Sequence, residues 1–313
     1  MVETRVIPAD EAGIAEAASL IRLGQPVAVP TETVYGLAAD AGQDRAVASI
    51  YAAKRRPAFN PLIVHVGDLA MAAEIASLPP LALRLAESFW PGPLTMVLKR
   101  RDDARIARLA TAGLPTVALR IPAHPVIRAL IGATGKPLAA PSANASGSIS
   151  ATLAEHVARS LAGRVPLVLD GGATEVGIES TIIAVEADRL RLLRPGGLTI
   201  EALEAVAGAP VEVSAGGAIE APGQLSSHYA PGKPLRLGAV RAEPGEFLIG
   251  FGEIAGAASL SPNGDLVEAA ARLFDLLHRA DASDASGIAI APVPDTGLGL
   301  AINDRLKRAA APR

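Results

Sequence analysis

The chain has 313 residues, enough for one large or two ordinary domains, and half of them are hydrophobic although only 3% are aromatic. With 29 Lys and Arg against 32 Asp and Glu, the formal net charge of −3 argues against a protein that mainly coats nucleic acid. The absence of cysteine excludes disulfides, thiol catalysis and cysteine-ligated metal sites. The first ten residues contain charges and no apolar run, and no stretch is apolar enough to span a membrane, which predicts a soluble cytoplasmic protein.

Helical and strand patterns alternate along the first two hundred residues, which favours an α/β fold. The first expected helix places Ile14 and Ile21 on one face, with Asp10 as its cap, and a short strand follows over Pro26–Pro30. Further strands are expected at 62–66, 94–98, 116–121, 138–140, 166–169, 180–185 and 190–193, and further helices near 47–51, 71–76, 81–89, 126–131 and 153–161.

The regular pattern lapses between residues 209 and 234, where glycine and proline recur. We interpret this segment as a linker between a first domain (1–208) and a small α/β domain (235–313). In the second domain the expected strands lie at 247–251 and 287–291, and the expected helices at 266–278 and 300–308.

Common nucleotide and metal signatures are missing from the sequence. No G-x-x-x-x-G-K-[ST] loop is present, and no G-x-G-x-x-G follows a strand. The five histidines do not have the paired spacing of a metal site. A nucleotide would therefore require a less common kind of site.

Polar residues follow the first buried strand, where Thr31, Glu32 and Thr33 precede Tyr35 and Gly36. Hydroxyl and carboxylate groups at this position can line a pocket at the edge of an α/β sheet. The same residues also suit a capped turn, in which the threonines bond only to the backbone. The sequence leaves both interpretations open.

A cationic loop follows the second expected helix, with Lys54, Arg55 and Arg56 held between that helix and Pro57 and Pro61. A stiff cationic loop suits a triphosphate. Cations at the end of a helix are also favoured by its dipole, and both interpretations fit equally well.

Three more polar groups lie beside expected strands, at 141–148, 177–181 and 193–196, and Arg120 ends an apolar strand. A charged side chain in such a position usually has a defined partner. Trp90, the single tryptophan, is interpreted as a core anchor. Polar clusters at so many successive strand ends indicate a ligand site.

The ordered set of motifs PTETVYGL, K-x-R with NPLIVH, WPGPLT, TVALRIPAHP, APSAN, ESTI and LRPG, with PGQLSSHYAP in the linker, resembles the YrdC/YwlC-type threonylcarbamoyl-AMP synthases in their longer two-domain form. The resemblance covers nearly the whole chain. It implies a YrdC-like catalytic domain with a twisted mixed sheet, plus a small Rossmann-like α/β C-terminal domain. It also implies a reaction that joins L-threonine, bicarbonate and ATP into threonylcarbamoyl-adenylate and pyrophosphate.

The resemblance implies roles for individual residues. Lys54 and Arg56 are expected to be catalytic by stabilising charge on the triphosphate. The residues expected around threonine are Thr33, His65, Arg120, Ser142 and Ser180. Those expected around ATP are Arg56, Asn60, Thr116, Ser142, Asn144, Thr152, Arg194 and Tyr229. Mg²⁺ is expected on the nucleotide and not on protein ligands, and no covalent nucleophile is expected.

In the linker, residues 226–231 match a family segment that folds over the pocket, which would shield the carbamate and adenylate from water. The resemblance further implies that the product passes to a separate tRNA threonylcarbamoyl transferase complex, without stable tRNA binding and without a membrane. The alternative from another class is an RNA-binding YrdC-like module without synthase activity. A second rival is the related domain of hydrogenase maturation factors, whose acylphosphatase and zinc-finger segments this chain lacks.

Overall fold

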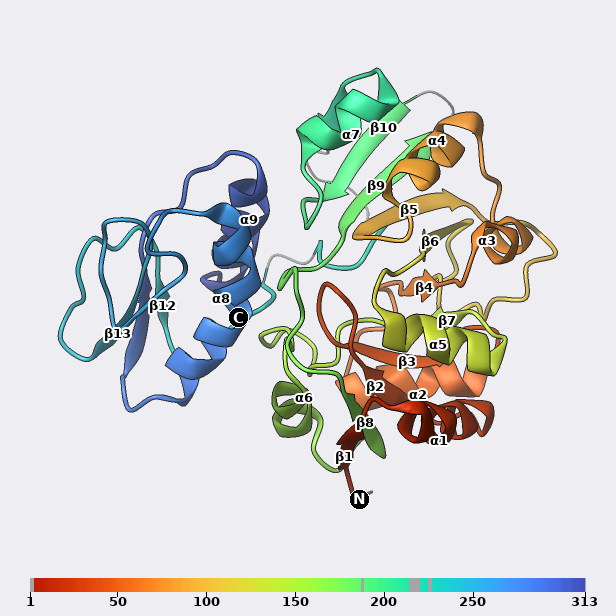
Figure 1. Cartoon of the computed structure of the whole chain (residues 1–313), viewed down its shortest axis with the longest axis horizontal. Helices are drawn as coiled ribbons and strands as arrows, with labels where there is room; N and C mark the ends of the chain where they lie inside the picture. The colour runs from red at the N-terminus through yellow and green to blue at the C-terminus, as the bar shows by residue number, and fades with distance from the viewer. Residues whose placement is uncertain (1–2, 187–188, 214–219, 225–226, 313) are drawn as a thin grey trace.

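A computed structural model of the chain describes residues 3–186, 189–213, 220–224 and 227–312. Within these residues the chain forms one large mixed sheet and one small sheet, each with helices packed on it (Figure 1). The alternation of helices and strands expected from the sequence is therefore present.

The large sheet has 11 strands in the order β1-β8-β2-β3-β7-β4-β6-β5-β9-β10-β11 within the described residues. Its strands are β1 (Arg5–Pro8), β2 (Val27–Val29), β3 (Gly36–Asp40), β4 (Ile63–His65), β5 (Leu94–Lys99), β6 (Thr116–Arg120), β7 (Leu138–Ala139), β8 (Leu167–Asp170), β9 (Thr181–Glu186), β10 (Arg189–Arg194) and β11 (Val211–Val213). Its helices are α1 (Glu11–Arg22), α2 (Asp44–Lys54), α3 (Leu69–Ile75), α4 (Pro80–Phe89), α5 (Pro125–Thr134), α6 (Ala154–Leu161) and α7 (Ile200–Ala207).

Helices cover both faces of the sheet around β2, β3 and β8. Successive side chains of a strand point to opposite faces, so Val27 and Val29 pack with α1 and α5. Ala28, between them, belongs instead to the main core together with α2 and α6. This end of the sheet is therefore a closed sandwich.

The other end of the sheet is covered differently. Val117 and Leu119 of β6 face the main core under α4 and α7, whereas Ala118 faces the opposite way. On that second face a small apolar cluster includes Ile182 of β9, and the linker residue Ala221 packs against it. Because Arg120 shares the face of Ala118, polar side chains at this end can line a site that the linker partly covers.

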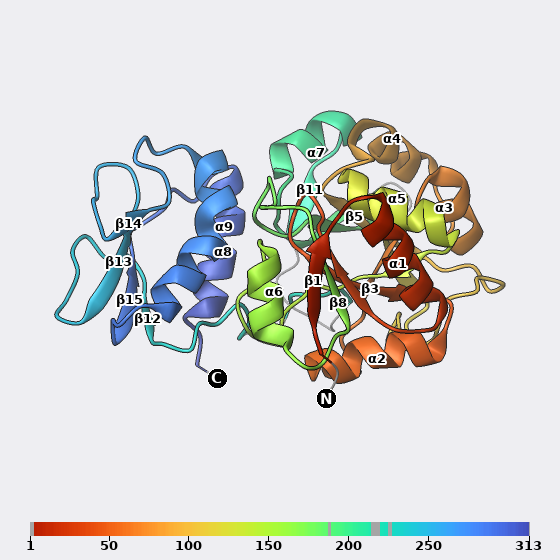
Figure 2. The ribbon, with the colours of Figure 1, turned by 60° about the horizontal axis from the view of Figure 1, so that its bottom comes forward.

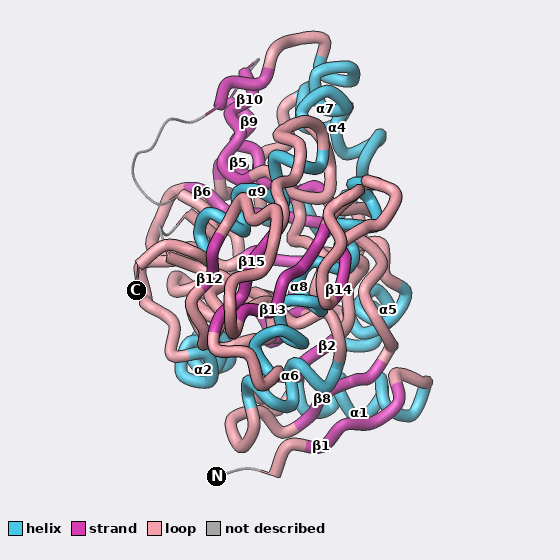
Figure 3. The backbone as a smooth tube through the Cα atoms, turned by 90° about the vertical axis from the view of Figure 1, so that its left-hand side faces the viewer, coloured by secondary structure: helices cyan, strands magenta, loops and turns pink. Residues whose placement is uncertain are grey.

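The strands of the small sheet are parallel and follow the order β12-β15-β13-β14. Figure 3 views the molecule from the side on which this sheet lies. Its elements are β12 (Leu235–Arg236), β13 (Glu246–Gly250), β14 (Ala258–Ser259), β15 (Gly287–Ile290), α8 (Leu266–Ala282) and α9 (Leu298–Ala309). Helices α8 and α9 lie between this sheet and the large domain, and α8 lies beside α6 (Figure 2). One apolar cluster contains Phe274 of α8 together with Val34, Ile149 and Ile178 of the large domain, so the domains share a core.

Several elements were not expected from the sequence: β1, β3, α7, β11, β12 and β14. Strand β3 has the sequence GLAAD, whose small residues fit a strand buried on both faces but resemble a turn when met alone. Strand β11 lies inside the predicted linker and pairs with β10 at the edge of the large sheet. The predicted boundaries at 208/209 and 234/235 remain predictions, and residues 214–219 and 225–226 lie outside the described chain.

Candidate active site

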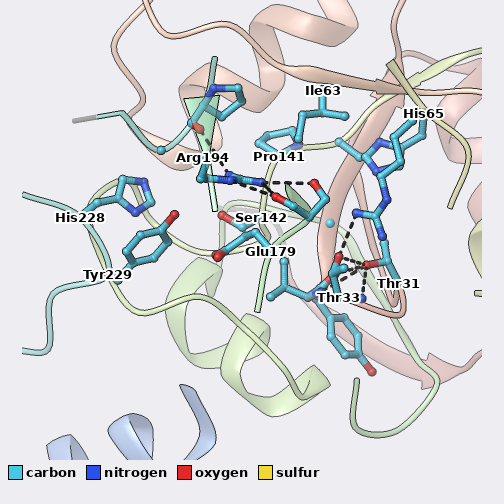
Figure 4. Close-up of a pocket in the computed structure, with 18 of the residues that line it drawn as sticks. Thr31, Thr33, Ile63, His65, Pro141, Ser142, Glu179, Arg194, His228 and Tyr229 are labelled. Atoms are coloured by element: carbon cyan, nitrogen blue, oxygen red, sulfur yellow. Dashed lines mark hydrogen bonds between the residues drawn. The ribbon is translucent and has the colours of Figure 1, made fainter. Parts of the chain in front are cut away.

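A buried pocket lies where loops from the large sheet meet the linker (Figure 4). It is lined by Thr31, Thr33, Val34, Tyr35, Gly36, Arg56, Ile63, His65, Arg120, Ala140, Pro141, Ser142, Glu179, Ser180, Arg194, Pro222, Gly223, His228 and Tyr229. Polar clusters that the sequence places far apart are thus combined at one site.

All residues expected around threonine line this pocket: Thr33, His65, Arg120, Ser142 and Ser180. Strands β4 and β6 are parallel, and their register places His65 directly beside Arg120. Burial, followed by the charge of Arg120, lowers the pKa of His65 to about 3, so its imidazole is neutral at pH 7. Nδ1 of His65 is buried and has no hydrogen-bond partner among the described residues.

Arg120 is held from three directions. Its Nη2 lies 2.6 Å from Oε1 of Glu32, its Nη1 donates to Oγ1 of Thr33 at 2.9 Å, and its Nε donates to the carbonyl of Gly92 at 3.1 Å. Burial would raise the pKa of Glu32, but the charge and hydrogen bond of Arg120 hold it below its usual value. Glu32, which the sequence placed in the loop without a role, therefore fixes the guanidinium.

Arg194 lies on the other side of the pocket. Its Nη2 donates to the carbonyl of Ser180 at 2.8 Å and its Nη1 to the carbonyl of Pro222 at 3.4 Å. Oγ of Ser180 lies 2.8 Å from Oγ1 of Thr95. Arg194 thus connects the end of β10 to the linker while keeping its positive charge in the pocket wall.

The cationic loop contributes one cation to the pocket wall and one to its support. Arg56 donates from Nε and Nη2 to the carbonyls of Asn60 and Pro61, at 3.2 and 2.9 Å, and lines the pocket. Burial lowers the pKa of Arg56 to about 10, which still leaves it charged at pH 7. Lys54 is buried behind the wall, and its Nζ donates to the carbonyls of Ser142 and Asn144.

Four of the residues expected around ATP do not line the pocket: Asn60, Thr116, Asn144 and Thr152. The amide of Asn144 donates to the carbonyls of Ala145 and Ser148, and Oγ1 of Thr152 lies 3.4 Å from Nδ1 of His156. The side-chain amide of Asn60 is buried without a hydrogen-bond partner among the described residues. Thr116 lies at the opposite end of β6 from Arg120, in a separate hollow that includes Glu220.

Tyr229 reaches the pocket from the linker with a left-handed backbone (φ 61°), a conformation that costs free energy unless its surroundings enforce it. Its ring packs edge-on against His228 and near Phe274 of α8. Gly223 approaches so closely that an added Cβ would lie 2.8 Å from Cδ of Arg194 and 3.0 Å from the Tyr229 hydroxyl. The linker is therefore packed tightly onto this wall.

Sequence reasoning missed two polar residues of the wall, Glu179 and His228. Each is the immediate neighbour of a residue that was predicted, Ser180 and Tyr229, and lies within the motif that identified it. Glu179 forms an ion pair with Arg305 of α9 at 3.0 Å, and no sequence pattern indicated that arginine.

Known proteins match both halves of the chain. A family model described as "Telomere recombination" matches residues 19–196, and one described as "Threonylcarbamoyl-AMP synthase, C-terminal domain" matches residues 198–311. The threonylcarbamoyl-AMP synthase of Bacillus subtilis is 42% identical over 96% of this chain and 93% of its own length. That of Pyrococcus abyssi is 40% identical over 95% of this chain and 94% of its own. The chain belongs to the threonylcarbamoyl-AMP synthase family.

Solved structures agree with membership of this family. P. abyssi Sua5 complexed with L-threonine matches with a TM-score of 0.89 and 37% identity, over 99% of this chain and 97% of that one. Escherichia coli YciO matches 63% of the chain with a TM-score of 0.55 and 24% identity, which is a likeness of fold alone. The expected YrdC-like sheet with an added C-terminal domain, as in the two-domain threonylcarbamoyl-AMP synthases, is thereby confirmed.

Proposed function

We propose that this chain is a threonylcarbamoyl-AMP synthase, which makes L-threonylcarbamoyladenylate and pyrophosphate from L-threonine, bicarbonate and ATP. The observation that carries the proposal is the arrangement of two residue sets in one pocket. Thr33 and His65 lie on one side, Arg194 and Tyr229 on the other, and Ser142, expected to touch both substrates, lies between them (Figure 4). The proposed activity is the one named for the full-length relatives.

In the proposed reaction, the threonine amine attacks the carbon of bicarbonate, and a carbamate forms with loss of water. A carbamate oxygen then attacks the α-phosphorus of ATP, and the bond to the bridging oxygen breaks as pyrophosphate leaves. The protein contributes mainly position and charge to this displacement. Arg56 and Arg194 would stabilise the phosphate oxygens, while Thr33, His65 and Arg120 would orient threonine.

Lys54 would act indirectly in this scheme. Its ammonium group holds the carbonyls of Ser142 and Asn144, and so fixes the loop that lies between the two substrates. The roles expected for Asn60, Asn144 and Thr152 in ATP binding would require the linker or their own loops to rearrange when the nucleotide enters. Thr116 begins β6 and pairs with Lys99 of β5, and its expected role in ATP binding stays a prediction.

Mg²⁺ enters the proposal only as a counter-ion on the ATP phosphates. Among the described residues no group of three or more His, Asp or Glu side chains could hold a metal ion.

We also propose that the linker shields the intermediate from water, that the product passes to a tRNA threonylcarbamoyl transferase complex, and that the enzyme acts in the cytoplasm. In the described part of the chain, none of the helices has the length and apolar composition needed to cross a membrane.

The direct test is to incubate the purified chain with ATP, bicarbonate and single amino acids, and to measure pyrophosphate and carbamoyl-adenylate. Pyrophosphate release that requires both threonine and bicarbonate would support the proposal, and serine would measure how strictly threonine is selected. Tight tRNA binding at moderate salt without any consumption of ATP would instead favour the RNA-binding alternative.

A further inference from the structure

Arg305 is the largest fully buried side chain in the described part of the chain, with 0% of it exposed. It belongs to α9 in the C-terminal domain, yet it points into the wall of the active site in the other domain. Its guanidinium carbon lies 5.4 Å from the centre of the Tyr229 ring. A buried arginine is costly unless each of its contacts is well placed, so its partners indicate its role.

Two of those partners, Glu179 and Pro195, belong to the pocket wall or its support. Nε of Arg305 lies 3.0 Å from Oε2 of Glu179, and Nη1 donates to the carbonyl of Pro195, the residue after Arg194. Nη1 also contacts the neighbouring Asp304 at 3.1 Å. The other carboxylate oxygen of Glu179, Oε1, accepts from the hydroxyl of Ser150 at 2.5 Å. Both oxygens of Glu179 are therefore occupied.

The pairing of the Glu179 carboxylate matters because Glu179 lies beside residues expected to bind ATP. Glu179, Arg194 and Tyr229 line the same side of the pocket, opposite Thr31, Thr33 and His65 (Figure 4). A free carboxylate there would repel the phosphates of ATP, or would turn to Arg194 and cancel its charge. Arg194 instead bonds to the carbonyls of Ser180 and Pro222, so its positive charge is available to an anion.

We infer that Arg305 is a positioning residue for ATP: from the C-terminal domain it neutralises and holds Glu179, and so keeps Arg194 free for the phosphates. This inference rests on the proposed function and gives the C-terminal domain a part in it. The small domain completes the electrostatics of the site, so its docking and nucleotide binding depend on each other.

The test compares the full-length variants Arg305→Met and Glu179→Gln. We measure the KM of ATP and of threonine from pyrophosphate release, and the Kd of ATP alone by calorimetry. Arg305→Met leaves the Glu179 carboxylate without its counter-ion beside ATP. We expect ATP binding to weaken at least about tenfold, which is the effect of a single misplaced charge in a buried site. The KM of threonine should stay unchanged. Glu179→Gln removes the negative charge from the pocket wall, so ATP binding should become tighter.

The opposite changes in ATP affinity expected for Arg305→Met and Glu179→Gln distinguish this role from simple domain docking. Both variants break the same interdomain ion pair, so a purely structural role would weaken ATP binding in both. The double variant Arg305→Met with Glu179→Gln should return to within about threefold of the wild-type Kd, because the repelling charge is gone. Unchanged or weaker ATP binding in Glu179→Gln, or a double variant as weak as Arg305→Met, would overturn the inference.

Controls keep the result interpretable. Arg272→Met and Glu268→Gln break an ion pair of 2.9 Å inside the C-terminal domain and should leave the Kd of ATP unchanged. If Arg305→Met does not fold, as judged by thermal unfolding, the direction of change in Glu179→Gln decides alone. Calorimetry also separates the two proposals, because a wild-type chain that binds ATP but releases no pyrophosphate would refute the function and still test Arg305.

Discussion

Nη2 of Arg120 lies 2.6 Å from Oε1 of Glu32, and both side chains are buried at the end of the pocket that also holds Thr33. The ion pair joins the loop after β2 to the end of β6. Removing one partner of a buried pair leaves an uncompensated charge, which costs far more than the pair itself contributes. The pair therefore ties the threonine side of the site to the stability of the fold.

We expect Glu32→Gln to lower the free energy of unfolding by about 3–5 kcal/mol, because Arg120 stays buried without its counter-ion. Urea unfolding measures the change. The matched control is Glu16→Gln, whose partner Arg5 is exposed, and its effect should be much smaller. Equal effects of the two substitutions would contradict this account of the Glu32–Arg120 pair.

Arg56→Ala should raise the KM of ATP about tenfold or more, since a buried cation is removed from the pocket wall. The KM of threonine should change much less, because Arg56 is not among the residues expected around threonine. Arg55→Asn is the control: Arg55 is exposed and has φ 53°, a conformation that asparagine tolerates. An unchanged dependence on ATP in Arg56→Ala would remove Arg56 from the nucleotide site.

Tyr229→Ala should reduce both ATP affinity and product yield, because it removes the ring packed between His228 and the C-terminal domain. Tyr229→Phe keeps that ring. The Tyr229 hydroxyl has no hydrogen-bond partner among the described residues, so its loss breaks no hydrogen bond and should not lower stability. ATP titration and product analysis of both variants provide the measurement. A wild-type yield with unchanged ATP binding in Tyr229→Ala would exclude a lid role.

Stability should fall as the pH drops below about 6.5, the ordinary pKa of histidine in an unfolded chain. Burial, and then the charge of His278, lowers the pKa of His156 to about 3, and the two rings stack across the domain interface with centroids 3.9 Å apart. Between these pH values the unfolded chain binds a proton that the folded chain does not, so stability is present above pH 6.5 and is lost toward pH 3.

The measurement is the free energy of unfolding at pH 7 and at pH 5. The difference between the two should be smaller by about 2 kcal/mol in His156→Gln than in the wild type, since each pH unit is worth about 1.4 kcal/mol. His124→Asn, at a half-buried histidine that caps α5, should alter the difference less. An undiminished pH dependence in His156→Gln would assign the effect to other groups.

The sequence by itself was sufficient for most elements and, through its resemblance to a known family, for the residues expected around threonine, which all line the pocket. Of these residues, His65 and Arg120 end β4 and β6, Thr33 lies in the loop after β2, and Ser180 directly precedes β9. These features are local: a strand ends, a polar residue follows, and the spacing between them is written in the chain.

Only the tertiary structure decided how each side chain uses its hydrogen bonds. Lys54 and Arg56 look alike in the sequence, yet Lys54 binds two backbone carbonyls behind the wall and Arg56 faces the pocket. Arg305 meets Glu179 across 126 residues and a domain boundary. Such pairs form when α9 packs on the large domain. Hydrophobic burial drives that packing but has no direction, so it does not specify the partner of a buried charge until the interface has formed.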